Sequence, residues 1–229
     1  MFPLYDENRF RSRPFVTWGL IIVNALVFVW ELNYTSWFTN EAALEAMLRN
    51  YGVTPFRFVE GNGSNALMTL ITSMFLHSDF LHIIGNMVFL YIFGDNVEYK
   101  FGHAKFLILY LIFGFAGASA HILLSFIPGG DPFIPAIGAS AAISGVLGAY
   151  VVYFPFAKVV TLIFFFFFVR LARVPAYAYI GFWFLLQFIN GALDSAGTVG
   201  YGAHVGGFIA GFLVAGIARV TKVVSTELT

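Results

Sequence analysis

The sequence contains no cysteine, which excludes disulfide bonds, thiolate catalysis and cysteine-ligated metal sites. Charged residues are also scarce, at 10% of 229 residues, whereas a soluble domain carries about 25%. Such a chain has too few charged side chains to cover a water-exposed surface. Its formal net charge is zero, so there is no electrostatic reason to expect a nucleic-acid partner. The scarcity of charge therefore predicts a membrane protein that lies in the lipid bilayer.

Hydrophobic residues make up 59% of the chain and gather in long runs. A membrane-spanning helix needs roughly 20 mostly apolar residues. The runs that meet or approach this length are Phe15–Leu32, His82–Val97, Lys105–Leu124, Ser140–Phe154, Ala176–Ile189 and His204–Ala218. They predict an all-α membrane protein, with a six-helix bundle that forms one domain over residues 1–229. A further stretch, Val159–Arg170, suits a hairpin or interfacial segment better than a crossing.

The lysine and arginine residues test this topology, because cytoplasmic loops carry an excess of them. Six crossings place ten of the 12 cations on one side of the membrane, and only Arg49 and Arg57 on the other. This asymmetry predicts that both terminal segments, residues 1–14 and 219–229, are cytoplasmic. We expect a multi-pass protein, with a prokaryotic plasma membrane as its location.

The largest non-cytoplasmic element is expected to be the loop from Asn33 to about His77. Within it, "NEAALEAMLRN" begins at a capping asparagine, Asn40, and has apolar residues at helical spacing. Aromatic residues such as Trp37 and Phe56 lie nearby and favour a position in the outer leaflet. The sequence thus predicts an interfacial outer loop, with a short amphipathic helix, between the first two spans.

Polar side chains at membrane depth are costly, so those within the spans should face the bundle interior. His82 and Asn86 are four residues apart and share a helical face, and His77 precedes them at the outer boundary. Two interpretations remain open for this group: hydrogen bonds that hold the helices together, or a metal site. A metal site has little support, because the sequence has no HExxH motif and no carboxylate on this face. We expect neither a metal nor another cofactor.

Two serines lie in the small-residue stretch "AIGASAAISGVLGAY". Ser140 and Ser144 share one helical face, and the many glycines and alanines around them are typical of close helix packing. The last span has a second thin face, on which small residues such as Gly207 recur every four positions. These patterns predict that the two helices pack with their backbones close together.

The same two helices carry a serine and a histidine that could react together. Ser140 and His204 each begin a predicted span on the outer side, so a hydroxyl and an imidazole should lie at similar depth, within reach of His82 and Asn86. A serine, a histidine base and extra hydrogen-bond donors are the components of nucleophilic acyl transfer. No carboxylate is expected to orient His204, because Asp194 should lie in an outer loop.

An earlier serine–histidine pair is a weaker candidate. Ser119 and His121 are only two residues apart, so on a helix they point to different sides and do not form a direct dyad. We interpret both as packing or boundary residues.

In this order, the motifs resemble the rhomboid family of intramembrane serine proteases. The similarity runs from about Leu70 to Gly216. It rests on HxxxxHxxxN (His77, His82, Asn86), the serine stretch at 138–148, "PAYAYIGFWFLLQF" with Trp183 and Gln187, and "AHVGGFIAG".

The resemblance implies a role for each matching residue. Ser140 corresponds to the nucleophile and His204 to the general base, while His82 and Asn86 stabilise the oxyanion. The residues that support the site are Gly138, Ala141, His77 and Gly207, and the candidates for lining a lateral gate are Trp183 and Phe184. The resemblance also implies a basin open to the non-cytoplasmic face and single-span membrane proteins as substrates.

One position departs from the family motif, which is usually GxSG. Here Ser140 follows Gly138 but precedes Ala141, and Ser144 precedes a glycine without having one two residues earlier. The extra methyl of Ala141 matters if the backbone needs a positive φ or if its N–H must approach the oxyanion closely. An alternative is therefore a catalytically inactive relative that binds membrane-protein clients. A channel or transporter is a third possibility, but the inner half of the spans offers almost no polar residues.

Overall fold

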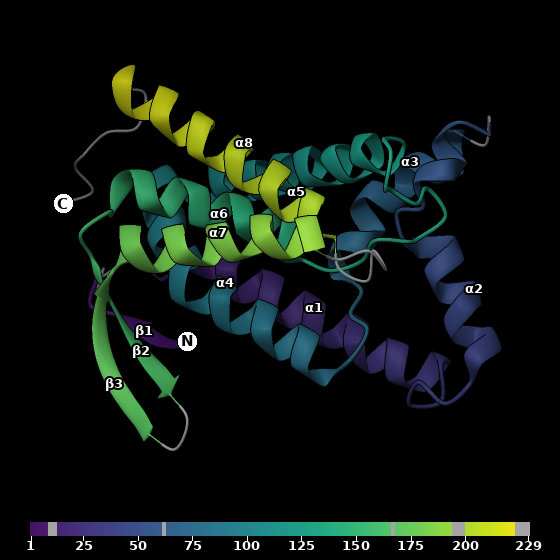
Figure 1. Ribbon diagram of the computed structural model, residues 1–229, viewed down its shortest axis with the longest axis horizontal. Helices are drawn as coiled ribbons and strands as arrows, with labels where there is room; N and C mark the ends of the chain where they lie inside the picture. Colours follow the sequence, from purple (N-terminus) through teal and green to yellow (C-terminus); the bar gives the residue numbers. More distant parts are fainter. Residues whose placement is uncertain (9–12, 61–62, 166–167, 194–199, 223–229) are drawn as a thin grey trace.

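The computed structural model describes residues 1–8, 13–60, 63–165, 168–193 and 200–222. Asp194, expected in an outer loop, lies outside these residues. The molecule is mostly helical, with a small sheet at one end of the bundle (Figure 1). Its elements are β1 (Phe2–Asp6), α1 (Phe15–Tyr34), α2 (Glu41–Tyr51), η1 (Pro55–Phe58), α3 (Gly63–Thr72), η2 (Ser73–Phe75), α4 (Phe80–Phe101), α5 (His103–Ser125), α6 (Ser140–Tyr153), β2 (Lys158–Phe165), β3 (Phe168–Pro175), α7 (Ala176–Leu193) and α8 (Tyr201–Val220).

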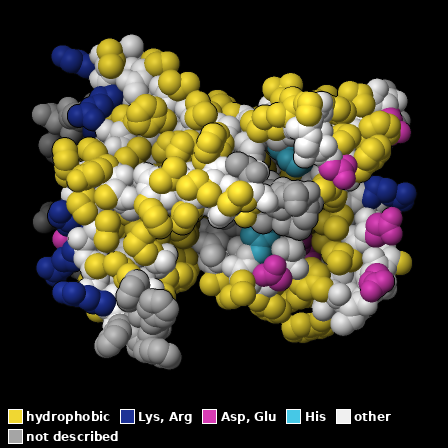
Figure 2. Space-filling view, viewed as in Figure 1, with side chains coloured by type: hydrophobic (Ala, Val, Ile, Leu, Met, Phe, Trp, Pro, Cys, Tyr) yellow, Lys and Arg dark blue, Asp and Glu magenta, His cyan; other side chains and the backbone are white. Residues whose placement is uncertain are grey.

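Among the described residues, α1, α4, α5 and α8 are long and apolar enough to cross a membrane. Each contains one of the predicted spans. The predicted spans at 140–154 and 176–189 correspond to α6, which has only 14 residues, and to α7, which has 18. The surface of the bundle is largely hydrophobic (Figure 2). The fold is thus that of a helical membrane protein.

Helix α6 lies at the centre of the bundle, where ten of its 14 residues are buried. It packs closely on α8, as the small-residue pattern predicts. A Cβ atom added at Gly207 would lie 2.0 Å from the Ala141 carbonyl oxygen, and one added at Gly211 would lie 1.8 Å from the Gly145 carbonyl oxygen. Only glycine permits this approach of two backbones. The packing brings the first residues of α6 and α8 together.

A three-stranded antiparallel sheet, in the order β1-β2-β3, corrects the all-α expectation. Strands β2 and β3 lie where the sequence predicts a hairpin or an interfacial segment, at Val159–Arg170, and the β-branched and aromatic residues there favour strands. The additional strand β1 pairs with β2 and was not predicted. It comes from the N-terminal segment, where only five residues form the strand and give little periodicity to detect.

The segment before α6 is held in place by residues that precede α4 in the sequence. Val53 and Ala136 form an isolated antiparallel bridge, and the Gly138 N–H donates to the Ser73 carbonyl oxygen over 2.8 Å. Helix α2 is present where the sequence predicts it, with the Asn40 side chain accepting from the Ala43 N–H. These contacts fix the residues that lead into the N-terminus of α6.

The C-terminal end of α6, which we call its inner end, carries a polar cluster that the sequence analysis did not foresee. The Tyr150 hydroxyl donates to the Asp6 carboxylate, and the Asn96 amide donates to the same oxygen over 3.0 Å. All three residues are buried. Burial raises the pKa of Asp6 to about 6. The inner half of the bundle is therefore less apolar than expected, and this cluster ties β1 to α4 and α6.

Candidate active site

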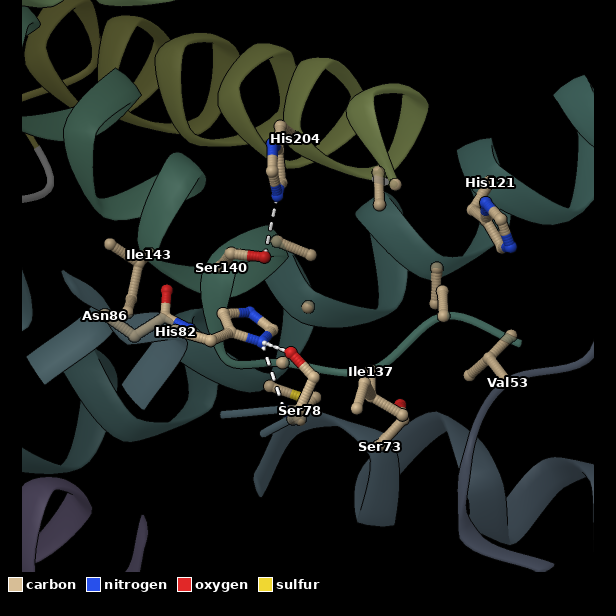
Figure 3. A pocket seen from close by; sticks show the side chains of 18 of the residues that line it. Val53, Ser73, Ser78, His82, Asn86, His121, Ile137, Ser140, Ile143 and His204 are labelled. Atoms are coloured by element: carbon tan, nitrogen blue, oxygen red, sulfur yellow. Dashed lines mark hydrogen bonds between the residues drawn. The ribbon is translucent and has the colours of Figure 1, made fainter. Parts of the chain in front are cut away.

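Ser140 and His204 meet at the N-terminal ends of α6 and α8, which we call the outer ends. His204 Nε2 lies 2.7 Å from Ser140 Oγ, which is hydrogen-bonding distance (Figure 3). Ser140 is the first residue of its helix, and His204 is in the first turn of its own. The close packing of the two helices brings both side chains to the same level. The arrangement gives a serine hydroxyl a neighbouring base that can take its proton.

Ser144 lies one turn further along α6 and has a different environment. Its side chain is fully buried, and its hydroxyl donates to the Ser140 carbonyl oxygen over 2.6 Å. This is the back-bonding that serine makes within helices. Ser144 is thus a packing residue, whereas Ser140 faces an imidazole.

A cavity of about 690 Å³ opens beside this pair. It is lined by residues from several elements, among them Ser140, His204, His82, Asn86 and Trp183. Most of the wall is apolar, with a small number of polar groups among the lining residues, as is typical of ligand sites. The cavity is large enough for part of a peptide chain.

His82 belongs to α4 and approaches the cavity from the side opposite His204 (Figure 3). Its Nδ1 lies 3.4 Å from the Ser78 backbone N–H donor and 3.1 Å from the Ser78 hydroxyl. Because a backbone N–H only donates, Nδ1 is the acceptor nitrogen and the proton of a neutral ring is on Nε2. A Cβ atom added at Gly138 would lie 2.7 Å from this Nε2. His82 therefore presents an N–H donor at the segment before Ser140.

Asn86 lies one turn after His82 on α4 and is buried. Among the described residues its Nδ2 has no hydrogen-bond partner. Buried donors are nearly always paired, so an unpaired one that lines a cavity is free to bind a ligand oxygen. The first N–H groups of α6 likewise have no partner within their helix. Together these donors form a region that can stabilise a negative oxygen.

His77 lies behind His82 rather than beside Ser140. Its side chain is fully buried, and the two imidazole rings pack edge to face with centroids 5.0 Å apart. The His77 backbone N–H donates to the Glu31 carboxylate over 2.9 Å, which joins the segment before α4 to α1. Burial lowers the pKa of His77 to about 3. A neutral His77 therefore supports the His82 ring through this edge-to-face contact.

Two residues of this site were not assigned a role from the sequence. Gln187 of α7 places its Oε1 2.7 Å from His204 Nδ1, at a position where the sequence analysis expected no carboxylate and did not consider an amide. A lone amide inside an apolar span was the signal that could have indicated it. His121, interpreted above as a packing residue, lines the cavity from α5. Its distance in sequence from the other polar residues gave no indication of this.

Ala141, the departure from the family motif, adopts a helical conformation and is not among the described residues with positive φ. Its methyl group faces Gly117 of α5, where an added Cβ atom would lie 2.7 Å away. The positive φ in this region belongs to Gly138, at 118°. The backbone conformation that requires glycine is thus present before Ser140, and the space beside Ala141 accommodates its methyl.

The two gate candidates lie on the same helix, α7. Trp183 lines the cavity, with its ring 6.2 Å from the His204 ring and 6.4 Å from that of Phe89 on α4. Phe184 stacks on Phe208 of α8 with ring centroids 4.3 Å apart. Trp183 therefore closes the space between α4 and α7, whereas Phe184 joins α7 to α8.

Comparison with known proteins agrees with the family that the sequence motifs resemble. The family model described as "Rhomboid domain" matches residues 64–220. The chain is 32% identical over 144 residues to "RHOMBOID-like protein 12, mitochondrial" of Arabidopsis thaliana, covering 58% of this chain and 39% of that protein. It is 31% identical over 149 residues to "Rhomboid protein 1, mitochondrial" of Saccharomyces cerevisiae, covering 64% and 40%.

The relatives also include a protein named as inactive. "Inactive rhomboid protein 1" of Drosophila melanogaster is 30% identical over 94 residues, which is 41% of this chain and 6% of that protein. The matched region spans about two fifths of the length of the two mitochondrial relatives. The family model covers more than half of this chain, with all the site residues inside it. The chain therefore belongs to the rhomboid family.

Proposed function

We propose that the protein is an intramembrane serine endopeptidase that cleaves the transmembrane segments of other membrane proteins. The observation that carries the proposal is the 2.7 Å contact between Ser140 Oγ and His204 Nε2 at the wall of a cavity. His204 takes the Ser140 proton as the oxygen attacks a peptide carbonyl carbon. The protonated His204 then gives this proton to the leaving amine, and water hydrolyses the resulting acyl-enzyme by the same route.

The negative oxygen of the tetrahedral intermediate needs donors that are already oriented. His82 Nε2–H, Asn86 Nδ2 and the first N–H groups of α6 serve this purpose. His82, Asn86 and Ser140 line the cavity, and the Asn86 donor has no partner among the described residues. Their orientation before the substrate arrives avoids the cost of rearranging dipoles during the reaction.

The protein crosses the membrane six times in this proposal, with α6 and α7 as the two shorter spans. Most of the visible lysine and arginine side chains gather at the end of the bundle that carries the sheet and the end of α8 (Figure 2). This end is cytoplasmic if the protein follows the positive-inside rule. Both termini are then cytoplasmic, and the cavity opens to the opposite face, as expected for a plasma-membrane protein of prokaryotic type.

The substrates are single-span membrane proteins that reach the site by diffusion within the bilayer. Helix α7 carries exposed apolar residues toward the lipid, including Phe182, Leu185 and Phe188, and its Trp183 stands between the lipid and the cavity. Movement of Trp183 opens a lateral path between α4 and α7. An unwound peptide segment with small residues fits such a path best.

Cleavage of a single-span substrate in proteoliposomes tests the proposal. The wild-type protein and Ser144→Ala should release the same fragment, and Ser140→Ala should release none. Identical fragments from the wild type and Ser140→Ala would contradict the proposal, because the activity would then come from another residue or a contaminant.

The alternative, a catalytically inactive member that binds membrane-protein clients, has one observation in its favour. The chain shares 30% identity over 94 residues with a relative named as inactive. Such a protein would bind the same single-span substrates and leave them whole. Co-purification of an intact substrate with the wild type, and no fragment after prolonged incubation, would favour this alternative.

A further inference from the structure

His204 has a hydrogen-bond partner on each side of its ring, and each partner comes from a different helix. Nε2 contacts Ser140 of α6, and Nδ1 contacts Gln187 Oε1 of α7. Both distances are 2.7 Å. The His204 ring is therefore held between Ser140, which is the proposed nucleophile, and Gln187, which has no part in the proposed reaction so far.

The chemistry of the amide fixes the protonation of the ring. Gln187 Oε1 is a carbonyl oxygen and can only accept, so Nδ1 of His204 carries the hydrogen. A neutral imidazole has one N–H, and its Nε2 then has a free lone pair directed at Ser140 Oγ. We propose that Gln187 is a positioning residue, which holds His204 in the tautomer that accepts the Ser140 proton. This inference rests on the proposed function for its catalytic meaning, although the tautomer can be measured without it.

Gln187 differs from a carboxylate in what it contributes. It orients the ring and fixes the tautomer, but it carries no charge to stabilise the imidazolium that forms during catalysis. A neutral amide suits its place on an apolar helix, where a buried carboxylate would be costly. Because the acceptor comes from α7, the alignment of the base depends on the position of that helix relative to α8.

The tautomer is measured by nitrogen NMR of the protein in detergent micelles, with the imidazoles labelled with ¹⁵N. The chain has only five histidines, and His204→Ala identifies the signals of interest. In the wild type, His204 should show a single neutral tautomer with the hydrogen on Nδ1. In Gln187→Met, which has a similar size but no carbonyl, the signals should become those of a mixture. A mixture already in the wild type, or an unchanged tautomer in Gln187→Met, would overturn the inference.

The catalytic consequence is measured by the rate of labelling with a fluorophosphonate. Gln187→Met should lower the maximal labelling rate constant by about 10-fold, which is the effect of one lost hydrogen bond, without changing the concentration for half-maximal rate. Gln187→Glu keeps an accepting oxygen and should restore most of the rate. The matched control is Leu186→Met on the exposed side of α7, which should react like the wild type. Equal loss in Gln187→Met and Gln187→Glu would contradict a role for the acceptor.

The two measurements separate the inference from the proposed function. A wild-type protein that is folded and shows the Nδ1–H tautomer, but is not labelled, would contradict the protease and leave the orienting role of Gln187 intact. Among the described residues, His82 of α4 and Tyr201 of α8 are titratable groups near His204. Both are retained in every variant, so they affect all of them alike.

Discussion

The two ends of α6 hold two polar sites with opposite properties. At the inner end, Tyr150 and Asn96 are buried and both donate to the buried carboxylate of Asp6. At the outer end, Ser140 and His204 are bonded to each other at a cavity wall, but the donor of Asn86 has no partner among the described residues. Polar groups that bond to one another hold helices together. A site with an unpaired, oriented donor beside a nucleophile is instead prepared for a ligand.

The largest contrast is expected between two asparagines of the same helix, α4. Asn86→Ala removes a donor from the proposed oxyanion site and should lower kcat by about 100- to 1,000-fold with little change in melting temperature. Asn96→Ala removes a donor from the inner cluster and should lower the melting temperature with little change in kcat. Cleavage kinetics and tryptophan fluorescence on heating measure both quantities. An Asn96→Ala variant that lost as much kcat as Asn86→Ala would contradict this separation.

Tyr150→Phe should give a smaller effect, confined to stability. It removes the hydroxyl that donates to Asp6 and leaves that buried carboxyl with fewer partners, at a cost of about 1–3 kcal/mol. The free energy of unfolding in a denaturing detergent provides the measurement. If Tyr150→Phe lost cleavage activity but kept the wild-type free energy of unfolding, the inner cluster would instead act on the active site.

The inner cluster should also make stability depend on pH. Burial raises the pKa of Asp6 to about 6 from an ordinary value of 3.8, so the folded state binds a proton that the unfolded state releases between these values. Stability should therefore fall as the pH rises from about 4 to about 6, and Asp6→Asn should remove that part of the slope. Melting temperatures across this range, compared between the two proteins, test the prediction. If the stability of Asp6→Asn fell with pH as steeply as that of the wild type, another titrating group would be responsible for the pH dependence.

The smallest effect is expected for Ala141→Gly. The methyl of Ala141 packs against Gly117 in a regular helix, so its removal should change the cleavage rate by no more than a few fold. Stability should fall by about 0.5–1 kcal/mol, because glycine is less favourable within a helix. Restoration of activity from an inactive wild type would contradict this account and support the client-binding alternative.

Much of the outer site could be predicted from the sequence, because its residues lie at regular helical spacing. His82 and Asn86 share a face by their separation of four residues, and glycines every four residues predict that α6 and α8 pack closely. The contact of Gln187 with His204 was missed, because it depends on how α7 lies against α8. No local pattern encodes that position.

The inner site could not be predicted for a related reason. Asp6 belongs to a short segment before the first span, and its partner Tyr150 is 144 residues away. The contact depends on the pairing of β1 with β2, which a five-residue strand does not reveal. Local periodicity therefore predicts which residues share a helix face, whereas contacts that depend on a distant strand require the structure.

The central claim is that Ser140 is a nucleophile activated by His204, and the most direct test is to locate a fluorophosphonate adduct by mass spectrometry. The account predicts an adduct on Ser140 in the wild type and in Ser144→Ala, and none in His204→Ala. A folded wild-type protein without an adduct, or an adduct on any other residue, would contradict it.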